Sequence, residues 1–341
     1  MWITKGQDRA IRIMKSAIET DRVSHAYLIS GPEHVGKTTF ALDMARAVNC
    51  QNDDVESVPC GDCSQCKRIL SFVHTDVFFY GVQPTKSNSD VLSQMVTIDS
   101  LRDDFISQVH KKPFEGKARV FIISAVEKMR SEQANVILKT LEEPPDDTVI
   151  ILLSEQIDGI IDTIVSRCQS ITLNSVSDDL SEKYIEEYWP DFETYSSTEL
   201  ARLSKGRLGW INNAVSDETV MVSRGELLDI YEAVVGNSID ERLDVSSKLG
   251  DRFRKSHNSG KEELDVWMTL WRDMLLIKSG RVNEVANISR REIMEKISAK
   301  LSVVEITDSI KLISTFGTQL NLNISPRLAL DNLMIKLPQS L

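Results

Sequence analysis

Two groups of residues in this sequence have types and spacings that could support chemistry. One is the segment GPEHVGKTT, in which Gly31, Gly36, Lys37 and Thr38 match the phosphate-binding pattern G-x-x-x-x-G-K-[ST] in full. Glycines let the backbone wrap a phosphate, and the amides at the start of the next helix point toward it. The lysine of this pattern adds charge to the β- and γ-phosphate oxygens, and the hydroxyl holds magnesium. The segment predicts a nucleotide site, with a relic loop as the alternative.

The chain around this loop has the context that the motif requires. An apolar run over residues 25–30 reads as a strand, and the residues after Lys37 carry a helical pattern. We assign two further residues to the nucleotide site, namely Thr39, which follows the motif, and Ser154, which ends another apolar run.

The second group contains four of the five cysteines, namely Cys50, Cys60, Cys63 and Cys66. In a reducing cytosol such a cluster indicates metal binding rather than disulfides. Four thiolates at these spacings can supply the tetrahedron that zinc requires, so we predict a structural Zn²⁺ site on an inserted loop. Because no coordination position stays open, we expect no catalytic zinc. An iron–sulfur cluster accepts the same ligands, and free thiols are the third alternative.

One side chain that a nucleotide hydrolase needs is missing. In such enzymes a second strand normally ends in an acidic residue that holds the magnesium of the nucleotide. Here the apolar run that begins ARVFII stops on Ser124 and Ala125. The nearest acid is Glu127, which we expect to lie on the next segment, beyond the end of the strand. The sequence therefore predicts that ATP or ADP can bind weakly without turnover, with Glu127 as a replacement carboxylate the alternative.

The elements that must position these residues form an α/β first half and a helical second half. The runs that read as strands cover residues 25–30, 76–82, 118–124, 148–154 and 170–174. Strands separated by helical patterns predict a parallel sheet with helices on both faces. Beyond residue 175 we expect helices only, several of them long and amphipathic.

Composition limits the class of protein. The charge is 40 − 51 = −11, which disfavours a protein whose main work is to grip phosphate backbones, although it does not exclude one basic face. No stretch approaches the ~20 apolar residues of a membrane span. The segment MWITKGQDRAIRIMK is charged and helical in pattern, so we expect no secretory signal and a cytoplasmic protein without membrane partners.

Several segments, taken in order, resemble the DNA polymerase III clamp-loader subunits of bacteria, which belong to the AAA+ class. They are SHAYLISGPEHVGKTTFALDMARAVNC, the cysteine insert, HTDVF, ANVILKTLEEPP and SRC. LEEPP and SRC are the sharpest marks, because they lie near the subunit contact in that family. The C-terminal NLNISPRLALDNLMIKL is similar to the last helix of the family's collar domain. The resemblance is dense over residues 1–175 and thin between about 215 and 320.

The resemblance implies a fold class and a division into domains. We expect an α/β P-loop domain of the AAA+ class with a parallel sheet, followed by a small helical lid and an all-α collar domain. The expected bounds are 1–174 for the α/β domain with its four-cysteine insert at 50–66, 175–217 for the lid, and 218–341 for the collar.

Two kinds of subunit share this pattern, the gamma/tau motor ATPase and the delta-prime stator. The motor's strand ends in Asp-Glu, whereas this chain has Ser124 and Ala125 at the matching positions. Gly209 stands where the motor's lid has a phosphate-sensing arginine, and we expect Arg207, two positions earlier, to face elsewhere. Both departures favour a stator that leaves hydrolysis to its neighbours. A gamma/tau-like motor is the alternative, and a different P-loop or DNA-processing role is the third.

The resemblance also implies a role for Arg167, the arginine of SRC. In the family this residue projects into the nucleotide site of the neighbouring subunit, so Arg167 is expected to be an arginine finger that acts in trans. A surface salt bridge, for example to Asp162, is the alternative. Glu142 and Glu143 are expected at a surface turn and subunit contact. The implied partners are the gamma/tau and delta subunits, the sliding clamp, and primer–template DNA reached through the complex.

Overall fold

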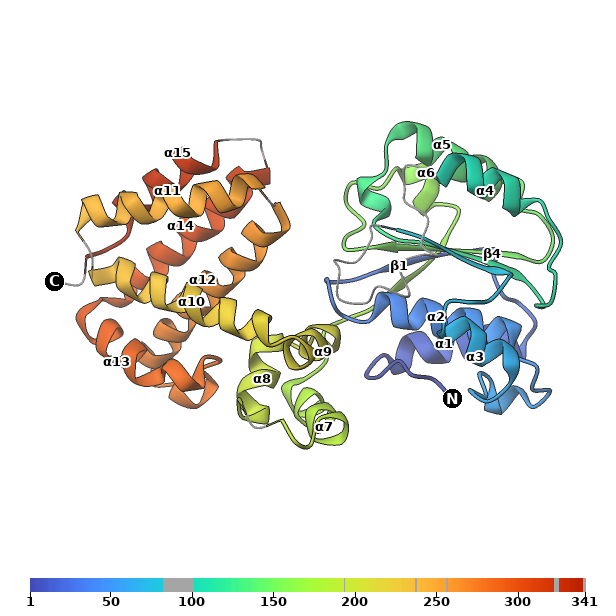
Figure 1. Cartoon of the computed structure of the whole chain (residues 1–341), viewed down its shortest axis with the longest axis horizontal. Helices are drawn as coiled ribbons and strands as arrows, with labels where there is room; N and C mark the ends of the chain where they lie inside the picture. Colours follow the sequence, from blue (N-terminus) through green and yellow to red (C-terminus); the bar gives the residue numbers. More distant parts are fainter. Residues whose placement is uncertain (82–100, 193, 237, 256, 322–324, 340–341) are drawn as a thin grey trace. The chain divides into compact units, whose positions relative to one another are not determined.

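The computed structural model describes most of the chain as two compact units. The described residues are 1–81, 101–192, 194–236, 238–255, 257–321 and 325–339. The first unit consists of Met1–Leu180 with Gly206–Gly209, and the second of Ser181–Lys205 with Trp210–Leu341. Figure 1 shows that the first unit is a sheet with helices on both faces, and that the second unit is built from helices.

The sheet of the first unit has five parallel strands in the spatial order β2-β3-β4-β1-β5. They are β1 (Ala26–Ser30), β2 (Val77–Tyr80), β3 (Arg119–Ile123), β4 (Thr148–Ser154) and β5 (Gln169–Thr172). The three central strands are buried along their whole length. This burial on both faces explains their uninterrupted apolar sequences. The predicted strands and their parallel arrangement are confirmed, with small differences at the strand ends. Residue 82, the predicted end of the second strand, lies outside the described residues.

Each face of the sheet packs against its own set of helices (Figure 1). One face is covered by α1 (Asp8–Glu19), α2 (Lys37–Asn49) and α3 (Ser64–Leu70), and the other by α4 (Leu101–Val109), α5 (Ser131–Glu142) and α6 (Asp162–Val165). Alternate strand residues enter opposite cores, as the pleat of a strand requires. Ile122 packs in the core that contains Phe40 of α2, whereas Phe121 packs in the core that contains Ile137 of α5.

The parallel order gives the sheet two chemically different edges. We call the side where the strands end the carboxyl edge; it carries Gly31 after β1 and Ser154 at the end of β4. We call the side where the strands begin the amino edge; it carries Arg167, just before β5. The five residues of β1 span about 13 Å at ~3.3 Å per residue, so the two edges are separated by at least that distance.

A buried carboxylate organises the amino edge beside β2 and β3. Asp76 is only 1% exposed and accepts hydrogen bonds from the backbone N–H groups of Phe114, Glu115 and Gly116, each at 2.8 Å. Burial raises the pKa of Asp76, but the three N–H groups, those of Glu115 and Phe114 foremost, outweigh this effect and lower the pKa. The carboxylate thus fixes the loop that leads into β3.

The second unit is helical throughout its described residues. Its helices are α7 (Asp178–Tyr188), α8 (Ser197–Ser204), α9 (Leu208–Ser216), α10 (Glu218–Gly236), α11 (Ile239–Lys255), α12 (His257–Lys278), α13 (Arg291–Lys300), α14 (Val303–Asn321) and α15 (Pro326–Lys336). The first residues of α7 and α9 belong to the first unit. Trp267 and Trp271 of α12 lie in its main core with Tyr231 of α10. The predicted fold class is confirmed. The predicted boundary between residues 217 and 218 falls inside the second unit, so the division into lid and collar stays a prediction.

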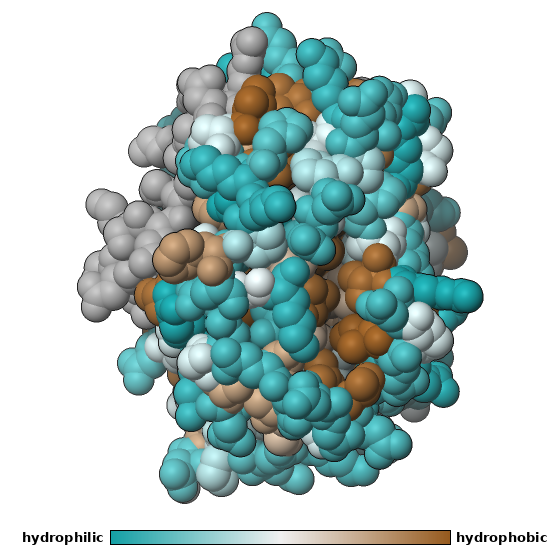
Figure 2. Space-filling model, turned by 90° about the vertical axis from the view of Figure 1, so that its right-hand side faces the viewer, coloured by the Kyte–Doolittle hydropathy of each residue, from teal (hydrophilic) through white to brown (hydrophobic). Residues whose placement is uncertain are grey.

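The face of the molecule that Figure 2 shows is mostly polar. Figure 2 shows one face on which hydrophilic side chains predominate and hydrophobic ones gather in separate patches. In the described part of the chain, no helix combines the length and the apolar character that crossing a membrane demands.

Replacing Asp76 with asparagine should destabilise the first unit. The new NH₂ group cannot accept a hydrogen bond, so one buried backbone donor loses its partner. We expect the free energy of unfolding at neutral pH to fall by roughly 1–3 kcal/mol, as measured by urea denaturation. Asp191→Asn, at an exposed position, is the matched control and should leave stability unchanged.

The same variant has a predicted pH dependence. Because the folded pKa of Asp76 is lowered, the ionised carboxylate contributes stability above its unfolded pKa of about 3.9, and this contribution is lost as the pH falls through the folded value. The stability difference between Asp76→Asn and the natural chain should therefore shrink below about pH 4. A difference that is constant down to that range would argue against the ionised carboxylate as its source.

Candidate nucleotide and metal sites

The phosphate-binding loop lies at the carboxyl edge, between β1 and α2. The amide of Gly31 donates to Ser154 O of the neighbouring strand at 3.2 Å. Gly36 caps α2 with φ 102°, a conformation that disfavours residues with a Cβ. Lys37 Nζ donates to Gly31 O and Pro32 O, both at 2.7 Å, so its charge lies inside the loop. The structure thus brings Gly31, Gly36, Lys37 and Ser154 together.

The two other residues assigned to the nucleotide site come directly after Lys37 in the chain. Thr38 and Thr39 occupy the first turn of α2, where the free amides of a helix start favour negative charge. The arrangement can hold a phosphate group in the way that such loops do. Nucleotide binding itself stays a prediction.

Glu127, predicted as a possible replacement carboxylate, also lies at the carboxyl edge. Ala125 adopts a left-handed conformation with φ 55°, and the chain then forms the short helix η4 (Val126–Lys128). From there the Glu127 carboxylate returns to the sheet, where Ser154 Oγ lies 2.8 Å from its Oε2 and 2.5 Å from Gln156 O. Glu127 therefore lies on the segment after the strand, as expected, yet contacts a residue assigned to the nucleotide site.

The segment Gly206–Gly209 packs against the phosphate-binding loop. Gly209 N donates to His34 O at 2.9 Å, and Val176 N donates to Gly206 O at 2.9 Å. A Cβ on Gly209 would lie 2.8 Å from His34 O, closer than real Cβ contacts allow. A side chain at position 209 would thus displace the loop or the segment, which gives a steric reason for glycine here.

Arg207 lies close enough to the loop for its charge to act there. Burial lowers the pKa of His34 most, Glu33 opposes this, and the positive charges of Arg207 and Lys37 lower it further. The structure therefore places a guanidinium near the loop. It comes from position 207, whereas the arginine of the motor subunits is expected at position 209. No signal in the sequence could have shown this, because it depends on how residues 206–209 return to the loop.

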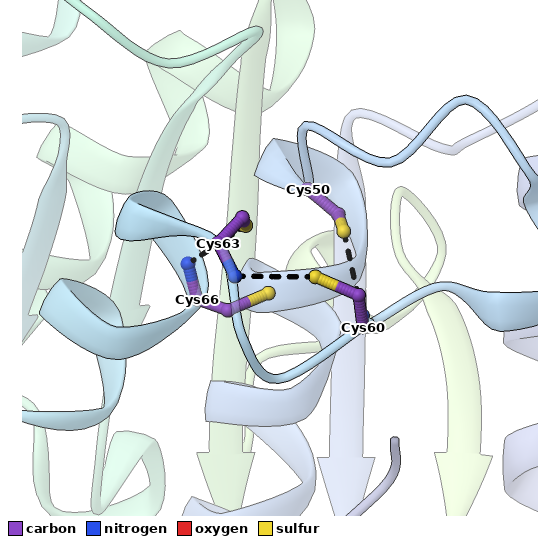
Figure 3. A group of neighbouring side chains, drawn as sticks. All are labelled: Cys50, Cys60, Cys63 and Cys66. Atoms are coloured by element: carbon purple, nitrogen blue, oxygen red, sulfur yellow. Dashed lines mark hydrogen bonds between the residues drawn. The ribbon is translucent and has the colours of Figure 1, made fainter.

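The four predicted metal ligands converge in space, as Figure 3 shows. Their sulfur atoms all lie within 4.8 Å of one another, whereas Zn–S bonds of 2.3 Å imply about 3.8 Å between sulfurs of a tetrahedron. Cys50 follows the last residue of α2, and Cys63 caps α3, which contains Cys66. Backbone N–H groups of Cys60, Cys63 and Cys66 donate to the sulfurs of Cys50, Cys60 and Cys63 in turn, each at 3.4 Å. The cluster fits a metal ion with only small movements.

The surroundings of Cys60 favour a thiolate, whereas burial raises the pKa of Cys66 to about 12. The backbone N–H of Cys63 is the main reason why the pKa of Cys60 is lowered to about 6. Gln65, inside the insert, donates to Glu115 O at 3.1 Å and contacts His74, so the insert is tied to the loop before β3. Cys50 and Cys66 are buried and Cys60 and Cys63 are partly exposed, and four thiolates would fill the coordination sphere of zinc, which is consistent with a structural role.

Arg167 lies at the amino edge, far from the phosphate-binding loop of its own chain. Its Nη1 donates to Thr163 O at 3.0 Å, and its Nη2 donates to Glu142 Oε1 at 2.9 Å. Both side chains are exposed, at 36% and 53%. The surface salt bridge predicted as the alternative role of Arg167 is present, with Glu142 rather than Asp162 as the acid.

Comparisons with known proteins identify a family and relatives of this chain. The family model described as DNA polymerase III, delta subunit, matches residues 6–177. The chain is 28% identical to the DNA polymerase III subunit delta' of Bacillus subtilis, over 98% of this chain and 96% of that protein. It is 25% identical to the tau subunit of the same organism, over 98% of this chain and 61% of that protein.

Among solved structures, a gamma subunit-related protein of Thermotoga maritima is similar at 17% identity and a TM-score of 0.44, over 96% of this chain and 97% of that one. The Bacillus subtilis DNA clamp loader delta protein is similar at 12% identity and a TM-score of 0.34, over 96% of this chain and 99% of that one.

The metal prediction is tested by composition and by substitution. Metal analysis of the purified chain should give about one zinc per chain, and Cys63→Ser should release it because three thiolates bind zinc more weakly than four. Hydrogen exchange should then rise in residues 50–70 and stay unchanged in the central strands. Cys168→Ser, outside the cluster, is the control. A metal-free natural chain of full stability would contradict a zinc site.

Substituting Gly209 tests the packing of residues 206–209 on the phosphate-binding loop. Gly209→Ala should force the loop and this segment apart, because the new Cβ meets a backbone oxygen. We expect faster hydrogen exchange in residues 31–36 and a loss of roughly 1–3 kcal/mol in stability. Gly225→Ala is the matched control, since its Cβ would meet only the end of the Arg290 side chain at 4.0 Å. Unchanged exchange in Gly209→Ala would show that the contact is dispensable.

Proposed function

This chain belongs to the DNA polymerase III delta-subunit family and is a clamp-loader subunit related to delta' and gamma/tau, and we propose that it is the non-hydrolysing stator of that complex. In this role it supplies Arg167 in trans to the nucleotide site of a neighbouring ATPase subunit while the sliding clamp is loaded on primed DNA. Its partners are the gamma/tau and delta subunits, the clamp, and primer–template DNA reached through the complex.

The location of Arg167 is the observation that carries this proposal. The guanidinium is exposed at the amino edge, while the chain's own phosphate-binding loop lies at the carboxyl edge. Arg167 is therefore too far away to act on a nucleotide held by its own chain, and only a site on another subunit is open to it. A guanidinium is always charged, and its planar fork matches phosphate oxygens.

The chemistry that such a residue supplies is electrostatic. Charge develops on the γ-phosphate as it is transferred, and an arginine provided by a neighbour can raise the rate by ~10³-fold or more. The chain's own loop, which contains Lys37, can bind ATP or ADP without turnover. Ser124 and Ala125 provide neither the magnesium ligand nor the group that polarises water. A structural Zn²⁺ on the four cysteines stabilises the insert.

A gamma/tau-like motor is the second candidate, and one contact favours it. The Glu127 carboxylate meets Ser154 beside the loop, so one acid is present at the carboxyl edge. The two candidates differ in the hydrolysis rate of the isolated chain. The stator predicts turnover far below ~1 per second, and a rate in that ordinary enzyme range would establish the motor.

The stator is tested in a complex reconstituted with gamma/tau and delta. Arg167→Ala should leave the chain folded and assembled, while the ATPase rate stimulated by clamp and DNA falls by ~10-fold or more. Lys37→Ala in this chain should have a much smaller effect, because its own nucleotide is not turned over. An unchanged rate in Arg167→Ala, or an abolished rate in Lys37→Ala, would mean that the trans-acting stator is the wrong assignment.

A further inference from the structure

We propose that Glu142 is a positioning residue that orients Arg167 toward the neighbouring subunit, a role that rests on the function proposed above. The evidence is the pair of hydrogen bonds that the guanidinium makes within its own chain. Thr163 O holds Nη1 at 3.0 Å and Glu142 Oε1 holds Nη2 at 2.9 Å. These acceptors come from α6 and α5, two separate elements, so together they fix the plane of the group as well as its position.

The backbone of Glu142 is held in place by the packing of α5. It is the last residue of α5, and the preceding Leu141 is 3% exposed in the core on that face of the sheet. Two prolines follow shortly after, at positions 144 and 145, and their fixed φ stiffens the chain that leaves the helix. The carboxylate is thus exposed while its backbone is held by a packed helix.

The two bonds leave most of the guanidinium available. An arginine has five N–H donors, and Thr163 and Glu142 account for two of them. Among the residues that the structure describes, none accepts a hydrogen bond from Nε of Arg167. A phosphate of the neighbouring subunit could therefore bind the free donors while both anchors stay in place.

The pair contributes more to orientation than to stability. Exposed ion pairs add little to the free energy of folding, and a carboxylate at the last turn of a helix is unfavourable for the helix dipole. An exposed arginine without anchors would sample many rotamers and would lose that freedom on reaching a phosphate. Because Glu142 and Thr163 hold the Arg167 side chain before a phosphate is reached, less conformational entropy is lost when the reaction occurs.

The test is Glu142→Ala in the reconstituted complex. We expect the stimulated kcat to fall about threefold to fivefold, with the KM for ATP unchanged and the melting temperature of the chain not lowered. Glu19→Ala, which removes the exposed acid at the last residue of α1, is the matched control and should behave like the natural chain. Glu142→Gln, which keeps a neutral acceptor, should lie between the two.

A second measurement separates orientation from a structural effect. In chains that already carry Arg167→Ala, adding Glu142→Ala should change the rate no further, because there is no guanidinium left to orient. An additional loss there, a kcat equal to that of the natural chain in Glu142→Ala alone, or an increased kcat would overturn the role of Glu142. Loss of activity in Arg167→Ala alone would still support the stator. An unaffected rate in Arg167→Ala would remove the proposed function itself.

Discussion

The constraint on which the rest of this structure depends is the parallel order of five strands. Backbone hydrogen bonds between parallel strands hold them in one direction, so every strand end lies on one edge and every strand start on the other. A phosphate-binding loop after β1 and an arginine before β5 must then lie on opposite edges, even though β1 and β5 are neighbours. The separation of the two candidate sites is a property of the sheet, and no side-chain movement can remove it.

Helix α2 connects the phosphate-binding loop with the cysteine cluster. Lys37 is its first residue and Cys50 follows its last, so one helix carries a predicted anion site at one end and a predicted metal site at the other. Its middle is also held, because the buried Asp43 accepts hydrogen bonds from Thr4 and from Arg46 of the same helix. Helix α2 therefore supports both the cysteine cluster and the phosphate-binding loop.

The parts that could be predicted from the sequence are those set by local patterns. The strands appear as apolar runs because both faces of the sheet are covered, and the loop and the cysteine cluster appear as motifs because their residues lie close together in the chain. The return of Glu127 to Ser154, the bond from Gly209 to His34, and the pairing of Arg167 with Glu142 could not be predicted. Each joins residues from separate elements, and only the packed fold determines which of the available partners is reached.

These long-range contacts hold the domain in shape at positions where its side chains depart from those expected of a motor subunit. Gly209 leaves no space for a side chain beside His34, so the segment Gly206–Gly209 packs on the loop through backbone atoms. Ser124 and Ala125 follow β3 and carry no carboxylate, and Glu127 contacts Ser154. Shape depends on backbone packing and buried apolar surface, which these residues preserve. Catalysis depends on a few charged groups, and Arg167, to which we assign a role in trans, lies at the edge of the sheet opposite the loop of its own chain.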